Sequence, residues 1–156
     1  MIQVKKKGAV IVMVLFDKLI WMIVVLFISL ITSLILFGES NITLAFFGIV
    51  LPPVLFMLYI AFDTKKYVDS ASITISENTV DFHAENLFTR SNNSVPTSQV
   101  NNATVNQGFI WKLFGIASVS FLDESGVMTS LWGFNYDDAV VFVKEFGSKY
   151  KIKMSR

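Results

Sequence analysis

The chain has 156 residues, a formal net charge of +1 and no cysteine, with 53% hydrophobic and 16% charged residues. This length allows one domain, or a membrane anchor with one small domain. The near-zero charge gives no electrostatic case for a nucleic-acid partner, and the lack of cysteine excludes disulfides, thiolate metal sites and a cysteine nucleophile.

Two uncharged runs, at 19–37 and 43–61, predict a hairpin of transmembrane helices. Each run has the length of a helix of about 28 Å, close to the roughly 30 Å thickness of the hydrocarbon layer. The link through Gly38, Glu39, Ser40 and Asn41 is short enough only for a tight turn. We therefore expect an N-terminal cytoplasmic or interfacial segment at 1–18, the hairpin at 19–62 and a cytoplasmic domain at 63–156.

The lysines around the two runs predict their orientation, because positive charge favours the cytoplasmic side. The turn between the runs carries only Glu39 as a charged residue. Six lysines flank the runs on their other sides: Lys5, Lys6, Lys7, Lys18, Lys65 and Lys66. Trp21 and Tyr59 lie near the same ends, as expected for interfacial aromatic residues. We expect a multi-pass protein of the cell membrane with both termini cytoplasmic. The alternative of a cleaved signal peptide is disfavoured, because the apolar run is too long and no small-residue cleavage site follows.

Three further features belong to this first part of the chain. Residues 8–16 are apolar but too few to cross a bilayer, so we expect them to lie in the interface or to extend the first helix. Ser29, Thr32 and Ser33 share a helix face suited to helix packing. The prolines at 52–53 predict a kink. Because neither run contains an ionisable residue, helix packing is favoured over an ion path.

The second part of the chain has the alternating pattern of strands. Residues 72–76 and 79–84 predict a hairpin that places Val80 and Phe82 on one face and Asp81 and His83 on the other. The polar run at 91–94 is interpreted as a loop or a turn between strands. Residues 100–107 and 127–134 predict further strands.

Residues 108–126 resemble a third membrane segment but are better explained as part of a water-soluble core. Lys112 and Gly115 interrupt the apolar run, and 116–122 alternate between apolar and small polar residues, as in a half-buried strand. We expect a short helical turn or loop at 109–114. A shallow dip of Trp111 and Phe114 into the headgroup layer is the alternative for this turn.

A helix closes the chain. Asn135 is a suitable N-cap, Asp137 and Asp138 favour the positive end of the helix dipole, and Gly147 is a natural stop. An apolar stripe follows helical spacing at Ala139, Val140, Val143 and Phe146. The following tail is basic, with Lys149, Lys151, Lys153 and Arg156. Six or seven strands followed by this helix predict a bent sheet or open barrel plugged by the helix, and thus a membrane-anchored α+β protein.

The segment SVPTSQVNNATVNQGFIWKLFGIASVSFLDESG at 94–126 resembles the signature of the bacterial pleckstrin-homology (PH-like) membrane proteins of the YdbS-like type. A proline-led strand, a strand ending at Gln107, the Leu113-Phe114-Gly115 turn and the alternating strand from Ile116 to Phe121 follow that pattern in order. Residues 72–90 fit the first hairpin of such a domain. The resemblance implies a PH-like barrel with a C-terminal helix at the inner face of a bacterial membrane, without enzymatic activity. Because the first hairpin carries few basic residues, the resemblance does not extend to a phosphoinositide-type site.

The sequence contains no pattern typical of catalysis or cofactor binding. His83 is the single histidine, no serine lies in a nucleophile elbow, and no acidic cluster has calcium-loop spacing. We therefore expect a non-enzymatic protein with no cofactor, no metal and no small-molecule substrate.

The leading hypothesis is a membrane-tethered module that binds protein partners, with self-association as one form of that binding. Its first candidate contacts are an unpaired strand edge and the surface around Trp111. The alternative is a sensor of anionic lipid or envelope stress that acts beside a partner membrane protein. Candidate contacts for membrane or partner are Lys65, Lys66, Arg90, Trp111, Lys112, Lys149, Lys151 and Lys153.

Overall fold

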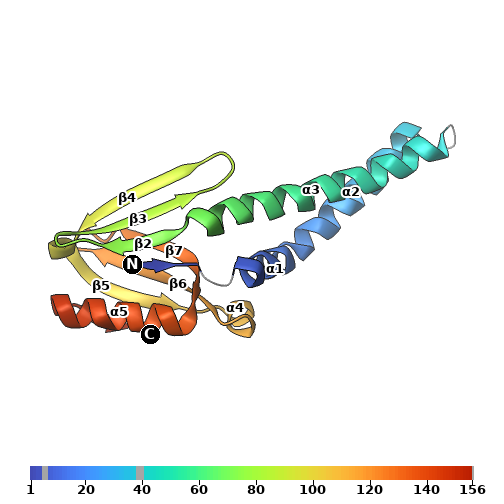
Figure 1. Ribbon diagram of the computed structural model, residues 1–156. Helices are drawn as coiled ribbons and strands as arrows, with labels where there is room; N and C mark the ends of the chain where they lie inside the picture. The colour runs from blue at the N-terminus through green and yellow to red at the C-terminus, as the bar shows by residue number, and fades with distance from the viewer. Residues whose placement is uncertain (5–6, 38–40, 156) are drawn as a thin grey trace.

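The computed structural model describes residues 1–4, 7–37 and 41–155. It has an α+β architecture in which two long apolar helices project from a domain of two β-sheets and a C-terminal helix (Figure 1). The helices are α1 (Lys7–Asp17), α2 (Leu19–Phe37), α3 (Ile42–Ser70), α4 (Phe109–Leu113) and α5 (Tyr136–Tyr150), with a 3-10 turn η1 (Thr97–Gln99). The strands are β1 (Ile2–Gln3), β2 (Ser72–Ile75), β3 (Thr79–Glu85), β4 (Arg90–Pro96), β5 (Val100–Asn106), β6 (Ile116–Asp123), β7 (Met128–Asn135) and β8 (Lys153–Ser155).

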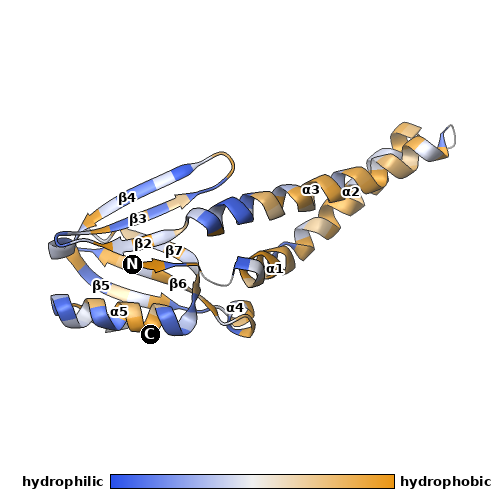
Figure 2. Ribbon diagram, viewed as in Figure 1, coloured by the Kyte–Doolittle hydropathy of each residue, from blue (hydrophilic) through white to orange (hydrophobic). Residues whose placement is uncertain are grey.

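Helices α2 and α3 are each long and apolar enough to cross a membrane. They lie side by side where they project from the domain, and their ribbons are coloured as hydrophobic over most of this stretch (Figure 2). Most of their apolar side chains are exposed. Asn41 caps α3, its side chain accepting a hydrogen bond from the Leu44 amide at 3.2 Å. The rest of the expected turn, 38–40, lies outside the described residues. Helix α3 continues through Pro52 and Pro53 to Ser70, so it enters the domain without a break.

Small residues hold the two long helices together, as their spacing predicts. The Ser33 hydroxyl on α2 donates to the Ala45 carbonyl on α3 at 2.6 Å. A Cβ atom on Gly48 would lie only 2.7 Å from the Ser33 Oγ, so glycine permits this close approach. Ser29 instead donates within its own helix, to the Val25 carbonyl.

The N-terminal segment belongs to the folded domain, which the sequence does not predict. Residues 8–16 lie in α1, which is separated from α2 by Lys18 and packs against α3. Val10 and Met13 are almost completely buried in the domain core. Ahead of α1, Ile2 pairs with Ile73 and adds β1 to the first sheet. The apolar character of this segment therefore reflects core packing in addition to any membrane contact.

The strands form two four-stranded sheets in the described part of the chain, with orders β1-β2-β3-β4 and β7-β6-β5-β8. All pairings are antiparallel except that of β5 with β8. The expected strands at 72–76, 79–84, 100–107, 116–122 and 127–134 are confirmed to within a few residues. These sheets do not close into a barrel among the described residues, so that form of the expected architecture is not present.

The interpretation of 91–94 as a loop is wrong, because these residues are the middle of β4. Six of the seven residues of β4 are exposed, so burial leaves no alternating pattern in its sequence. Pairing with β3 along its full length, from Glu85 opposite Arg90 to Thr79 opposite Pro96, holds it in the sheet.

Helix α5 packs on the second sheet and completes the core. Phe121 of β6 meets Phe82 of the first sheet and Phe146 of α5 edge-on, with ring centroids 5.4 and 5.0 Å apart. The Asn135 cap is confirmed, its side chain accepting from the amides of Asp137 and Asp138. The expected stop at Gly147 is wrong. This glycine is buried within the helix, which ends at Tyr150 with Lys151 in the left-handed conformation at φ 54°.

Candidate functional site at the junction of helices and domain

The tip of the β3–β4 hairpin is fastened to α3 by three contacts. The Asp63 carboxylate accepts a hydrogen bond from the Leu87 amide at 2.8 Å. The Tyr59 ring stacks on Phe88 with 6.0 Å between centroids. At the C-terminal end of α3, the Ser70 hydroxyl accepts a hydrogen bond from the Glu85 amide at 2.7 Å. These contacts set the position of the hairpin relative to the long helices.

Tyr67 joins α3 to the second sheet. Its hydroxyl donates to the Trp132 carbonyl at 3.1 Å and accepts from the Trp132 amide at 2.9 Å, and the two rings stack 4.3 Å apart. One hydroxyl thus satisfies both backbone groups of a residue in β7. Because such groups are costly to bury without partners, this contact fixes the end of α3 on the domain.

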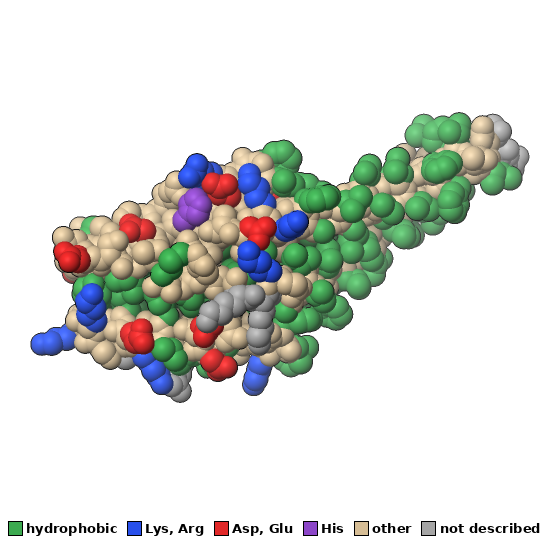
Figure 3. Space-filling view, in the orientation of Figure 1, with side chains coloured by type: hydrophobic (Ala, Val, Ile, Leu, Met, Phe, Trp, Pro, Cys, Tyr) green, Lys and Arg blue, Asp and Glu red, His purple; other side chains and the backbone are tan. Residues whose placement is uncertain are grey.

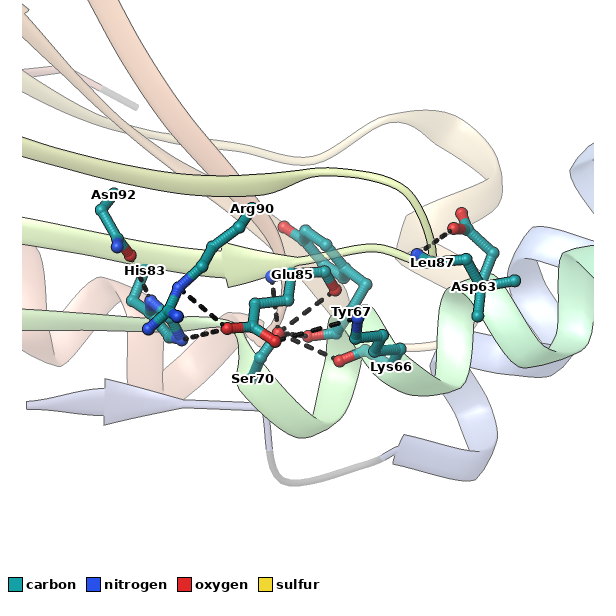
Figure 4. Close-up of polar contacts among 9 residues, drawn as sticks. All are labelled: Asp63, Lys66, Tyr67, Ser70, His83, Glu85, Leu87, Arg90 and Asn92. Atoms are coloured by element: carbon teal, nitrogen blue, oxygen red, sulfur yellow. Dashed lines mark hydrogen bonds and ion pairs between the residues drawn. The ribbon is translucent and has the colours of Figure 1, made fainter.

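Glu85 collects the charged side chains beside this junction (Figure 4). Its carboxylate lies 3.0 Å from the Arg90 Nε, 4.0 Å from the Lys66 Nζ and 3.8 Å from the His83 Nε2. The other ring nitrogen of His83 contacts the Asn92 side chain. Two of the basic residues singled out from the sequence, Lys66 and Arg90, therefore share one compensating carboxylate.

The other basic candidates lie elsewhere. Lys65 is exposed on α3, and Lys112 is exposed on α4, where the half-buried Trp111 packs near Trp132. Lys149 lies over the Tyr150 ring, Lys151 caps the C-terminal end of α5 and Lys153 lies in β8. Arg156 is outside the described residues. Charged side chains are accordingly scattered over the domain in Figure 3, whereas hydrophobic side chains cover the projecting helices.

The two groups of basic residues lie at opposite ends of the first sheet. The Tyr150 hydroxyl, next to Lys149 and Lys151, donates to the carbonyls of Ser76 and Glu77 in the β2–β3 turn. Lys66 and Arg90 lie at the other end of β3, around Glu85. The predicted set of basic residues is thus not one continuous surface.

Strand β4 forms the outer edge of the first sheet, and no other described strand pairs with that edge. Residue pairs in an antiparallel ladder alternate between hydrogen-bonded and non-hydrogen-bonded. Backbone hydrogen bonds from Asn86 to Thr89 and from Thr97 to Asn78, both 2.8 Å, fix this alternation at the two ends of the ladder.

The alternation divides the backbone groups of β4 into two sets. The set that bonds to β3 is Ser91, Asn93 and Val95. The set directed away from β3 is Arg90, Asn92, Ser94 and Pro96. Pro96 has no N–H to direct outward, which is where proline is tolerated in an edge strand. The free edge therefore offers unpaired donors and acceptors over the stretch from Arg90 to Ser94.

Asp81 holds this edge strand in place through its side chain. Its carboxylate accepts hydrogen bonds from Ser94 of β4 at 2.6 Å, from Ser76 at 3.1 Å and from Thr79 at 3.2 Å. The bond from Ser94, with those from the other two hydroxyls, holds the pKa of Asp81 below its usual value. The free edge of β4 is therefore presented by an ordered strand.

Among the described residues, no group of three or more histidine, aspartate or glutamate side chains could hold a metal ion. Sequence reasoning missed Glu85, Ser70 and Tyr67, because their roles depend on which strand each of them meets. Asn92 belongs to the run interpreted as a loop. Pro96, at the end of the same strand, is the one residue in the sequence that indicates an edge strand here.

Comparison with protein-family models, with curated proteins and with solved structures gives no match.

Proposed function

We propose that this protein is a membrane-tethered, non-catalytic module that binds protein partners through the free edge of β4. The observation that carries the proposal is the ordered edge strand of seven residues with outward-directed backbone groups. An extended segment of a partner adds to such an edge by backbone hydrogen bonds, a common mode of peptide recognition. The alternation favours a partner strand that pairs with Arg90, Asn92 and Ser94.

The apolar surface of the long helices supports the membrane tether. Side chains such as Ile28, Ile35 and Leu51 are more than half exposed and have no covering partner in the described chain. Lipid is the solvent that accommodates such a surface. In this proposal both helices cross the inner membrane of a bacterium and both termini are cytoplasmic. Tethering raises the effective concentration of the domain, so a weak contact becomes sufficient.

The PH-like assignment is part of the proposal. Two mainly antiparallel sheets followed by a helix that packs across the second sheet agree with the resemblance in 94–126. The alternative function, sensing of anionic lipid through Lys65, Lys66 and Arg90, is less well supported. Glu85 compensates two of these charges, and Lys149 and Lys151 lie at the far end of the domain.

Substitution of Asn92 by proline tests the edge-strand proposal. Asn92→Pro removes an N–H that points away from β3, so we expect the fold to survive while partner capture is lost. Asn92→Ala is the matched control, because it removes the same side chain and keeps the N–H. The measurement is chemical crosslinking of the full chain in native membranes, followed by gel analysis and thermal unfolding of each purified variant.

The comparison of the two variants decides the proposal. Capture by wild type and Asn92→Ala but not by Asn92→Pro supports strand addition, and a product of twice the chain mass identifies a second copy as the partner. Equal capture by both variants, or no crosslinked neighbour for the wild type, contradicts it.

A further inference from the structure

Two exposed apolar elements of the domain lie apart from the free edge of β4. The first is the tip of the β3–β4 hairpin, where Phe88 is 83% exposed beside the exposed Leu87. The second is α4, where Phe109 and Leu113 are 83% and 71% exposed. Residues four apart lie on one face of a helix, so α4 presents a single apolar face to solvent.

Both elements lie at the end of the domain from which the long helices leave (Figure 1). Strand β3 starts near the turn contacted by Tyr150 and ends at Glu85, beside Ser70 of α3. Strand β5 starts at Val100, opposite Asp123, and runs to Asn106, just before α4. The hairpin tip and α4 thus lie on either side of the helices in this view.

The contacts of these elements place them at the level of the expected membrane interface. Phe88 stacks on Tyr59, at the end of the second apolar run. On α4, the Trp111 ring lies 6.1 Å from that of Trp132. Trp132 in turn lines a cavity of about 410 Å³ together with Trp21 and Tyr59. Aromatic residues at the ends of membrane helices favour the headgroup layer, so both elements adjoin that layer.

We propose that the domain rests on the lipid surface through these two contacts, the Leu87–Phe88 tip and the Phe109–Leu113 face of α4. The occupant of this surface is lipid, because the hairpin tip meets α3 at Tyr59 and α4 packs against α1, whose Phe16 is exposed just before α2 begins. Lys112, which is exposed on the same short helix, is placed to contact anionic headgroups. The inference rests on the proposed membrane tether, and it fixes the orientation of the domain on its anchor.

The two lipid contacts, together with the unbroken helix α3, prevent the domain from rotating relative to the membrane helices. Asp63 and Tyr59 hold the hairpin tip to α3, and α4 packs against α1. Strand β4 runs from this tip toward the opposite end of the domain, so its free edge is presented to the cytoplasm at a fixed angle to the membrane.

Depth-dependent fluorescence quenching tests this inference. The chain has no cysteine, so Phe88→Cys and Leu113→Cys each provide one labelling site. Met128→Cys is the matched control, because Met128 is 63% exposed but pairs with Leu122 toward the far end of β6. Ile28→Cys reports on α2. Each full-length variant is labelled with a small fluorophore and reconstituted into phosphatidylcholine–phosphatidylglycerol vesicles with or without nitroxide-labelled lipid.

We expect strong quenching at positions 28, 88 and 113 and little at 128, with headgroup-level nitroxides most effective at 88 and 113. If the label at 28 is quenched but the label at 88, the label at 113 or both are not, the two-point contact is overturned while the membrane tether stands. Equal quenching at 88, 113 and 128 also overturns it, because contact would then not be confined to one end. An unquenched label at 28 contradicts the membrane tether itself. Thermal unfolding of each labelled variant shows whether the domain is folded.

Discussion

At the scale of single residues, Tyr67 makes the most consequential contact between the helices and the domain. Its hydroxyl serves as donor and acceptor to the two backbone groups of Trp132, and its ring is stacked on the indole. The residue is 5% exposed, so water does not replace a lost partner easily. A tyrosine near the end of a long helix would otherwise be assigned to the membrane interface.

Replacing Tyr67 by phenylalanine should therefore destabilise the domain. Removal of the hydroxyl leaves the part-buried N–H and C=O of Trp132 without partners, and we expect the free energy of unfolding to fall by about 1–3 kcal/mol. Thermal or denaturant unfolding of the full chain in detergent micelles measures this change. Tyr59→Phe is the control on the same helix, because Tyr59 is 43% exposed. Equal effects of the two substitutions would contradict the role of the Tyr67 hydroxyl.

At the scale of elements, β7 contains a bulge that the alternating pattern does not reveal. Ala117 pairs with Phe134 and Ser118 with Trp132, so Gly133 is an extra residue without a partner in β6. Its φ of 93° lies in the region that glycine adopts without strain. The bulge lies directly beside the backbone groups that Tyr67 binds.

We predict that Gly133→Ala costs about 1–3 kcal/mol of stability, because the added Cβ makes the positive φ strained. Space is not the reason, since that Cβ would meet the nearest side-chain atom, on Val4, at 3.5 Å. Gly8→Ala is the control, because a Cβ there meets nothing within 4 Å and alanine favours a helix. Denaturant unfolding of both variants measures the difference. An unchanged midpoint for Gly133→Ala would show that the bulge relaxes.

The elements that the sequence predicts are those in which residue types alternate or repeat at a regular spacing. Val119 and Phe121 alternate with serines, and Asn135 precedes the apolar stripe of α5, so β6 and the start of α5 follow from simple rules. Strand β4 has no such pattern, because its side chains face solvent and only backbone pairing specifies it. Strand β1 is two residues long, which is too short for any periodicity.

At the scale of the whole molecule, the first and last parts of the chain form one core. Ile2–Gln3 form β1 and Lys7–Asp17 form α1, and their buried side chains pack with strands more than sixty residues away. The candidate site has the same origin, since Glu85, Ser70 and Asp63 come together only when α3 meets the β3–β4 hairpin. Long-range packing of this kind has no local signal, which explains why the sequence predicts the basic residues but not the carboxylate that two of them share.

This shared core makes a prediction that separates a structural N-terminal segment from one that only lies on the membrane. Met13 is 1% exposed in the core, whereas Val12, its neighbour on α1, is 54% exposed. Met13→Ala leaves a cavity among core side chains, so we expect the free energy of unfolding to fall by about 2–5 kcal/mol. Val12→Ala should change it by at most about 0.5 kcal/mol, as is usual at surface positions. Both substitutions are made in a background in which Trp21 and Trp111 are replaced by phenylalanine, so that Trp132 is the remaining tryptophan. Unfolding of the full chain in micelles is then followed by the fluorescence of Trp132, which reports on the second sheet. If Met13→Ala left that transition unchanged, α1 would not be part of the domain core.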